Sequence, residues 1–110
     1  MAPFLNLAKR IAKRSPHKSF THSAIIFKGN AIYSHGFNFQ NEHAETSAIK
    51  NAPWVSELKG CTMLVIRVTR GKDLLANSRP CPDCERALKR VGIKKVLFST
   101  ADRKIEMMRI

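Results

Sequence analysis

The sequence has few acidic residues and none before Glu42, with eight Asp and Glu against 20 Lys and Arg among 110 residues. The formal net charge is therefore +12 at pH 7. Such a balance favours binding to polyanions or to ligands that bear phosphate. A solvated cationic surface that keeps the protein dissolved would have the same composition, so charge alone indicates nucleotide or nucleic-acid contact without establishing it.

The chain also lacks long apolar runs and widely spaced cysteines. No stretch approaches the roughly 18 apolar residues of a membrane-spanning helix, so we expect no membrane partner. Cys81 and Cys84 lie too close together for a long-range disulfide framework and indicate metal or redox chemistry in a reducing compartment. We expect a cytoplasmic location. Organelle import directed by the basic, amphipathic segment 4–14, or a nuclear location, is the alternative.

Hydrophobic periodicity predicts one α/β domain over residues 1–110. Helical spacing of apolar residues predicts helices over 4–14, 43–51 and 82–91. Apolar and β-branched runs predict strands over 23–28, 31–37, 62–69, 95–99 and 105–110. The expected architecture is a mixed five-stranded sheet flanked by helices in three α-β-α layers. Only about five residues separate the last two strands, too few for a crossover, so these strands should pair antiparallel.

The segment Pro80–Cys84 has the pattern of a metal site at a helix start. Its second proline suits the first helical position, and cysteines three residues apart share one face of a helix turn. A helix N-terminus also stabilises thiolates. His43 would supply a third ligand, and three ligands with an open fourth position are typical of catalytic zinc. Glu45, two residues after His43, would not bind the metal but would transfer protons.

Taken alone, the cysteine pair is also compatible with redox chemistry or with a closed structural zinc site. A redox pair would leave His43 and Glu45 without a role. A closed zinc site needs a fourth ligand, for which the candidates are Cys61, His17, His22 and His35. Cys61 opens a central strand and is typical of a small buried hydrophobe. We therefore predict one catalytic Zn²⁺.

These motifs resemble those of the cytidine and deoxycytidylate deaminase superfamily of zinc-dependent nucleobase deaminases, over almost the whole chain. The matching segments are Leu7-Ala8-Lys9-Arg10, Ser23-Ala24-Ile25-Ile26, Gly36-Phe37-Asn38, His43-Ala44-Glu45 and Pro80-Cys81-Pro82-Asp83-Cys84. The resemblance implies that His43, Cys81 and Cys84 bind zinc and that Glu45 is the proton shuttle. It also implies a five-stranded sheet flanked by helices.

The same resemblance implies substrate contacts. Asn38 would hydrogen-bond the sugar or base, with Asn41 as its competitor because the chain between Asn38 and His43 is short. Further candidates for substrate contact are Ala24, Phe37 and Ala44. Phe37 and Phe39 could stack on a base or belong to the core. His22 and His35 flank the first two strands, where they could line a pocket or lie on the surface.

The resemblance to subtypes is mixed. An antiparallel last strand is similar to the free cytidine deaminases, whereas nucleic-acid editing enzymes and tRNA adenosine deaminases usually have a parallel strand there. Yet free cytidine deaminases usually carry a cysteine in place of His43.

The leading hypothesis is hydrolytic deamination of cytosine to uracil in a nucleoside or nucleotide such as (deoxy)cytidine or its monophosphate. The metal would activate the attacking water, and Glu45 would protonate the ring nitrogen and the departing ammonia. The alternative keeps this chemistry for cytosine or adenine in single-stranded DNA or RNA, bound through the basic surface. A non-enzymatic, zinc-stabilised nucleic-acid-binding module is the third hypothesis. The family commonly forms homo-oligomers, so self-association of this protein is also an expectation.

Overall fold

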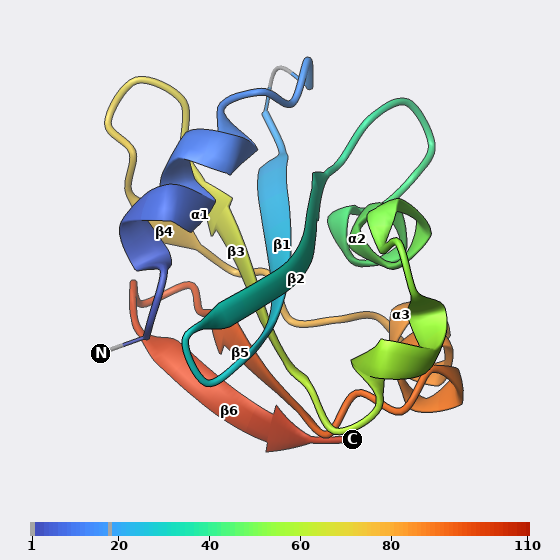
Figure 1. Ribbon diagram of the computed structural model, residues 1–110. Helices are drawn as coiled ribbons and strands as arrows, with labels where there is room; N and C mark the ends of the chain where they lie inside the picture. The colour runs from blue at the N-terminus through green and yellow to red at the C-terminus, as the bar shows by residue number, and fades with distance from the viewer. Residues whose placement is uncertain (1, 18) are drawn as a thin grey trace.

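The computed structural model describes residues 2–17 and 19–110, and their elements follow the predicted order (Figure 1). The α-helices in this part of the chain are α1 (Leu5–Ala12), α2 (Ala44–Asn51) and α3 (Pro82–Arg90). The predicted strands are present as β1 (Thr21–Lys28), β2 (Ala31–Phe37), β3 (Thr62–Val68), β5 (Lys95–Ser99) and β6 (Ile105–Arg109). None of the helices among the described residues is both long and apolar enough to cross a membrane.

The sheet is mixed, with the strand order β2-β1-β3-β5-β6. Strand β3 pairs antiparallel with β1 and parallel with β5. Strands β5 and β6 pair antiparallel, which confirms the prediction from the short connection between them.

Two short elements were not predicted. A two-residue strand, β4 (Leu75–Ala76), pairs with the end of β3 and brings the strand count to six, where five were predicted. A 3₁₀ helix, η1 (Val55–Leu58), follows α2. Neither segment is long enough to show a hydrophobic period, which is why the sequence pattern missed both.

Helices cover both faces of the sheet and confirm the three-layer α-β-α architecture (Figure 1). Side chains alternate between the faces along each strand, so Ala24 and Ile26 of β1 pack on the α2 and α3 side while Ile25 and Phe27 pack on the α1 side. Buried on both faces, β1 and β3 therefore read as nearly continuous apolar runs. Cys61, just before β3, is fully buried in the α2 and α3 core, as a small hydrophobe would be.

The sheet topology places the starts of α2 and α3 at the same edge. Strands β2 and β3 both run antiparallel to β1 and therefore run in the same direction. Helix α2 follows the carboxyl end of β2, and α3 follows the loop from the carboxyl end of β3. The residues that begin both helices are thus brought together although they are about forty positions apart in the chain.

Gly36 of β2 allows α2 to lie unusually close to the sheet. A Cβ atom at this position would lie 2.5 Å from the backbone nitrogen of Ala48 and 2.6 Å from Oγ of Ser47. The Ser34 hydroxyl, two residues earlier, donates a hydrogen bond to the carbonyl oxygen of Ala48. These contacts fix the position of α2, and with it the residues at its start.

We therefore expect Gly36→Ala to destabilise the protein by about 3 kcal/mol, because backbone atoms of α2 must move to admit the methyl group. Gly29→Ala is the matched control, since its φ of +59° is unfavourable for alanine but no atom lies within 4 Å of the new Cβ. The control should cost about 1 kcal/mol. Free energies of unfolding from urea titrations measure both values, and equal costs for the two variants would show that the close approach of α2 is wrong.

Candidate metal centre

The three predicted ligands come from the first turns of two helices. His43 is the residue that precedes α2, and Cys81 the residue that precedes α3; both have extended backbone conformations. Pro82 occupies the first turn of α3, where its missing N–H costs no hydrogen bond. Cys84 lies in the same turn. Because both helix N-termini carry partial positive charge, they favour the thiolate form of a cysteine beside them.

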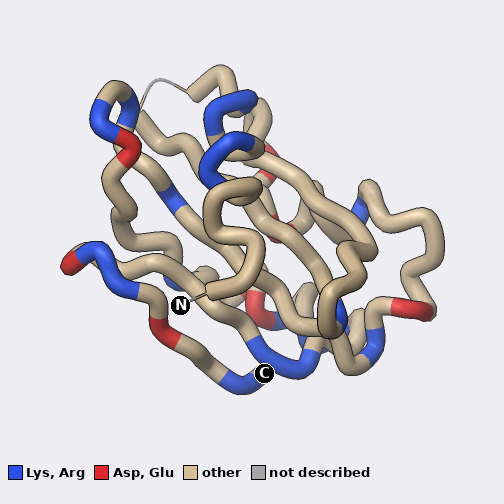
Figure 2. Tube along the Cα trace, turned by 60° about the vertical axis from the view of Figure 1, so that its left-hand side comes forward, with Lys and Arg blue, Asp and Glu red and all other residues tan. Residues whose placement is uncertain are grey.

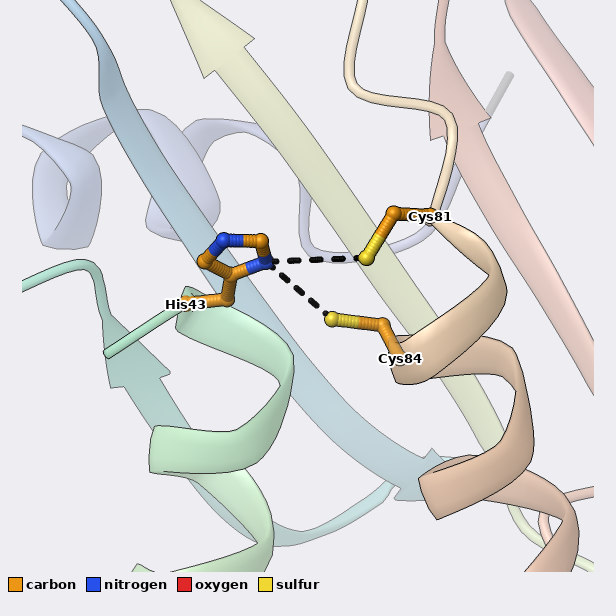
Figure 3. A group of neighbouring side chains, drawn as sticks. All are labelled: His43, Cys81 and Cys84. Atoms are coloured by element: carbon orange, nitrogen blue, oxygen red, sulfur yellow. Dashed lines mark hydrogen bonds between the residues drawn. The ribbon is translucent and has the colours of Figure 1, made fainter. Parts of the chain in front are cut away.

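The structure brings the three side chains into one cluster (Figure 3). Nδ1 of His43 lies 3.2 Å from Sγ of Cys84 and 3.9 Å from Sγ of Cys81, and the three atoms all lie within 4.8 Å of one another. A tetrahedral zinc ion, with bonds of about 2.1 Å to nitrogen and 2.3 Å to sulfur, separates such ligand atoms by about 3.6 to 3.8 Å. The cluster therefore fits one zinc ion with only small side-chain movements.

The donor atoms also select the metal. One imidazole nitrogen and two thiolate sulfurs form a soft set that suits zinc, whereas calcium and magnesium require oxygen ligands. Cys61 does not belong to the cluster formed by His43, Cys81 and Cys84, which removes it as a fourth ligand.

Glu45 lies beside this cluster without being part of it. Its side chain is buried in the first turn of α2, and burial raises the pKa of its carboxyl group, an effect that its own backbone hydrogen bond and His43 partly offset. Burial likewise raises the pKa of the Cys84 thiol, and the neighbouring Glu45 carboxylate raises it further. Two acidic groups that are buried together need a cation before both can ionise. This need agrees with a metal at the cluster.

A cavity of about 440 Å³ opens next to the ligands and reaches His43, Glu45 and Cys81. Its size lies in the usual range of small-molecule sites. One wall is the tight turn at Gln40 and Asn41, which is closed by reciprocal backbone hydrogen bonds between Phe39 and Glu42. The cavity thus joins the metal cluster to the outside.

The predicted substrate residues divide into two groups. Asn38, its competitor Asn41, and Ala44 all line the cavity. Ala24 lies in the core beneath α2, and Phe37 packs against the α1-side core, and neither belongs to the cavity wall. A substrate contact by any of these residues stays a prediction.

Asn38 has a structural task at the end of β2. Its Oδ1 accepts a hydrogen bond of 2.9 Å from the backbone N–H of His22, and its Nδ2 donates one to the carbonyl oxygen of Phe20. An amide side chain can make four hydrogen bonds, so part of its capacity is left for a ligand. Asn38 therefore holds the start of β1 against the end of β2 while it faces the cavity.

His22 lines the cavity, whereas His35 is exposed on β2 and is not among the cavity residues. Burial, with the charge of Arg67 as a second cause, lowers the pKa of His22 to about 4. His22 is consequently neutral near pH 7 and offers one hydrogen-bond donor and one acceptor.

Sequence reasoning did not assign six residues to the cavity wall, namely His17, Phe20, Gln40, Glu42, Ser78 and Arg79. It considered His17 only as a fourth zinc ligand, and His17 is not part of the cluster. Two of the six lie between α1 and β1, two lie between β2 and α2, and two lie in the loop before Cys81. They come from irregular segments that show neither hydrophobic periodicity nor a motif. Only the folded structure reveals that they meet at the cavity wall. The one available signal was position in the chain, since Glu42 directly precedes His43 and Arg79 directly precedes the Pro80–Cys84 motif.

Comparison with known proteins gives a consistent result. The family model described as "Cytidine and deoxycytidylate deaminase zinc-binding region" matches residues 2–100. A tRNA-specific adenosine deaminase of Aquifex aeolicus (strain VF5) is 36% identical over 108 residues. That match covers 92% of this chain and 66% of the length of the relative.

Two solved structures share the fold. The dCMP deaminase from the cyanophage S-TIM5, in its apo form, aligns with a TM-score of 0.68 at 21% identity, over 92% of this chain and 86% of that one. A diaminohydroxyphosphoribosylaminopyrimidine deaminase/5-amino-6-(5-phosphoribosylamino)uracil reductase from Thermotoga maritima aligns with a TM-score of 0.63 at 25% identity, over 88% of this chain and 28% of that one. The family model covers nearly all of the chain, and the donor set at the start of α2 and α3 fits zinc. This chain therefore belongs to the cytidine and deoxycytidylate deaminase family of zinc-binding deaminases.

Proposed function

We propose that this protein is a zinc-dependent hydrolytic deaminase that converts cytosine to uracil in a nucleoside or nucleotide such as (deoxy)cytidine or its monophosphate. The observation that carries the proposal is the position of Glu45. Its carboxyl group is buried, lines the cavity and lies next to the ligands without belonging to the cluster. A proton-transfer group needs this placement, within reach of both the metal site and a bound base.

Zinc held by His43, Cys81 and Cys84 would supply the Lewis acidity that brings the pKa of water to about 7. Glu45 accepts one proton of the attacking water and delivers it to the ring nitrogen. It then accepts the hydroxyl proton of the resulting adduct and delivers it to the amine, which leaves as ammonia while the carbonyl group forms. His22 and the two asparagines offer neutral donors and acceptors to the base and sugar. Burial of Glu45 keeps bulk water away from the proton it carries.

Two features support a small substrate. The cavity has a volume suited to a single nucleotide, and the short Gln40–Asn41 turn closes one of its sides. The antiparallel pairing of β5 with β6 is also similar to that of the free cytidine deaminases. The three free cysteines agree with a reducing compartment, and we propose the cytoplasm. Self-association stays a prediction.

A second candidate is a deaminase that acts on cytosine or adenine in single-stranded nucleic acid. It is supported by the 36% identity to a tRNA-specific adenosine deaminase and by the net charge of +12. Two exposed aromatic rings, Phe20 and Phe39, also lie at or beside the cavity, and exposed rings of this kind can stack on bases. Figure 2 shows Lys and Arg segments distributed along the chain. The charge therefore favours polyanions in general but does not indicate one continuous path for a nucleic-acid strand.

A screen of substrates tests the proposal directly. Zinc-loaded protein is incubated with cytidine, deoxycytidine, their monophosphates, and short single-stranded DNA and RNA that contain cytosine or adenine. Mass spectrometry then detects replacement of an amine by oxygen. We expect conversion of at least one free cytosine compound. Conversion in oligonucleotides alone would support the second candidate, and no conversion in any sample would exclude both.

Glu45→Gln tests the role of the carboxyl group. The substitution keeps the size of the side chain but removes its ability to transfer protons, so we expect kcat to fall by about 100-fold or more while zinc content stays at that of the unaltered protein. Glu57→Gln, on the exposed surface of η1, is the matched control and should leave both unchanged. Unaltered turnover in Glu45→Gln would remove Glu45 from the mechanism.

Cys84→Ser tests the metal ligands. Because serine is a poor ligand for zinc, we expect the zinc content measured by elemental analysis to fall well below one ion per chain. A chelator should lower the melting temperature of the unaltered protein but not that of the variant. Cys61→Ala is the control, since its thiol is buried away from the cluster and its loss should leave the zinc content intact. Full zinc occupancy in Cys84→Ser refutes the proposed ligand set.

A further inference from the structure

One wall of the catalytic cavity is formed by the connection between α1 and β1. We call the described residues 15–17, 19 and 20 the α1–β1 wall. His17 and Phe20 of this wall line the same cavity as Glu45 and Cys81, and both side chains are exposed. Neither residue takes part in the proton transfers or the metal binding of the proposed reaction.

Arg70 fixes the α1–β1 wall through hydrogen bonds to its backbone. Its Nε and Nη2 donate hydrogen bonds of 2.8 and 2.6 Å to the carbonyl oxygen of His17, and Nη2 donates a further bond of 2.7 Å to the carbonyl oxygen of Ser15. Arg70 lies two residues after the end of β3 and more than fifty residues after His17, so its hydrogen bonds join the wall to the end of the central strand. A guanidinium with planar, directed donors fixes two carbonyl groups at once.

The imidazole ring of His17 is oriented by its own backbone. Nδ1 accepts hydrogen bonds of 3.1 Å from the N–H of Ser19 and 2.9 Å from the N–H of Phe20. Because Nδ1 acts as an acceptor, the ring proton is on Nε2. Nε2 makes no hydrogen bond with any described residue, so an oriented N–H donor at the cavity wall has no partner within this part of the chain.

The surroundings of this donor are cationic. The Arg67 guanidinium lies 4.3 Å from the centre of the Phe20 ring, Arg70 contacts the backbone of His17, and Arg79 lines the cavity. Two acids also line the cavity: Glu42 forms an ion pair with Lys50, and Glu45 is buried beside the metal cluster. A hydrogen-bond donor in a positive field favours an anionic acceptor over a neutral one.

We propose that the Nε2–H group of His17 binds a phosphate group of the substrate, and that Arg70 is the residue that positions it. The proposal rests on the deaminase function for the identity of the substrate. The phosphate belongs either to a free nucleotide or to the backbone of a single strand, and both sources present the same anionic oxygens. His17 thereby distinguishes phosphate-bearing substrates from plain nucleosides.

Two substitutions of His17 separate its two nitrogens. In His17→Asn, the side-chain oxygen can replace Nδ1 as acceptor for the backbone N–H groups, but the donor at the Nε2 position is lost. In His17→Gln, the amide nitrogen replaces the Nε2 donor, while the acceptor at the Nδ1 position is lost. His35→Ala, which removes an exposed histidine outside the cavity, is the matched control.

Binding is measured by isothermal titration calorimetry on zinc-loaded protein, with the reaction products as probes so that turnover does not interfere. The probes are uridine, uridine monophosphate, and a trinucleotide of uridine without terminal phosphates. We expect a phosphate-bearing probe to bind about tenfold or more tightly than uridine, as one hydrogen bond to a charged group allows. Preference for the monophosphate indicates a free nucleotide as the source, and preference for the trinucleotide indicates a strand.

His17→Asn should abolish this preference, His17→Gln should retain part of it, and His35→Ala should leave it intact. Arg70→Ala should also reduce the preference, with partial rescue by Arg70→Lys, and without change in the affinity for uridine. Arg90→Ala, an exposed arginine on α3, is the control for charge alone. The proposal fails if the phosphate-bearing probes bind no more tightly than uridine, or if His17→Asn keeps the preference. Because binding is the measured quantity, this failure is distinct from an absence of deamination, which would refute the proposed function.

Discussion

The burial of two acidic groups against each other is the constraint on which the site depends. Glu45 and Cys84 are both shielded from water, and burial raises the pKa of each. Without a cation the charged forms of both groups are unfavourable. The N-termini of α2 and α3 supply part of the compensation, and a zinc ion held by His43, Cys81 and Cys84 would supply the rest. The arrangement of the ligands and of Glu45 is therefore suited to a bound metal cation.

The sheet makes this arrangement rigid. Two strands that run in the same direction, β2 and β3, bring α2 and α3 to one edge, and the missing side chain of Gly36 lets α2 lie directly against β2. The cavity wall is fixed independently by Arg70, which extends from the end of β3 to the α1–β1 wall. Strand β3, at the centre of the sheet, thus contributes both to the placement of α3 and to the support of the α1–β1 wall.

The sequence predicted the fold class, the mixed sheet and the antiparallel pairing of the last two strands, because long apolar runs and a short connection leave few alternatives. The metal cluster was also predictable, since His43, Cys81 and Cys84 occur in motifs whose spacing has a chemical reason. The positions of His17, Phe20 and Arg79 at the cavity were not predictable, because these residues lie in irregular segments. The sequence offered His17 only as a fourth zinc ligand. Asn38 shows the limit of a motif, since its amide also serves to join two strands.

X-ray absorption at the zinc edge of the purified protein tests the central claim most directly. We predict one zinc per chain with two sulfur neighbours at about 2.3 Å and two nitrogen or oxygen neighbours at about 2.0 to 2.1 Å. Addition of a substrate or product should alter only the light-atom part of the spectrum, because the fourth position is open to solvent and ligand. Three or four sulfur neighbours, or a spectrum typical of a closed site that no ligand changes, would contradict a catalytic zinc held by His43, Cys81 and Cys84.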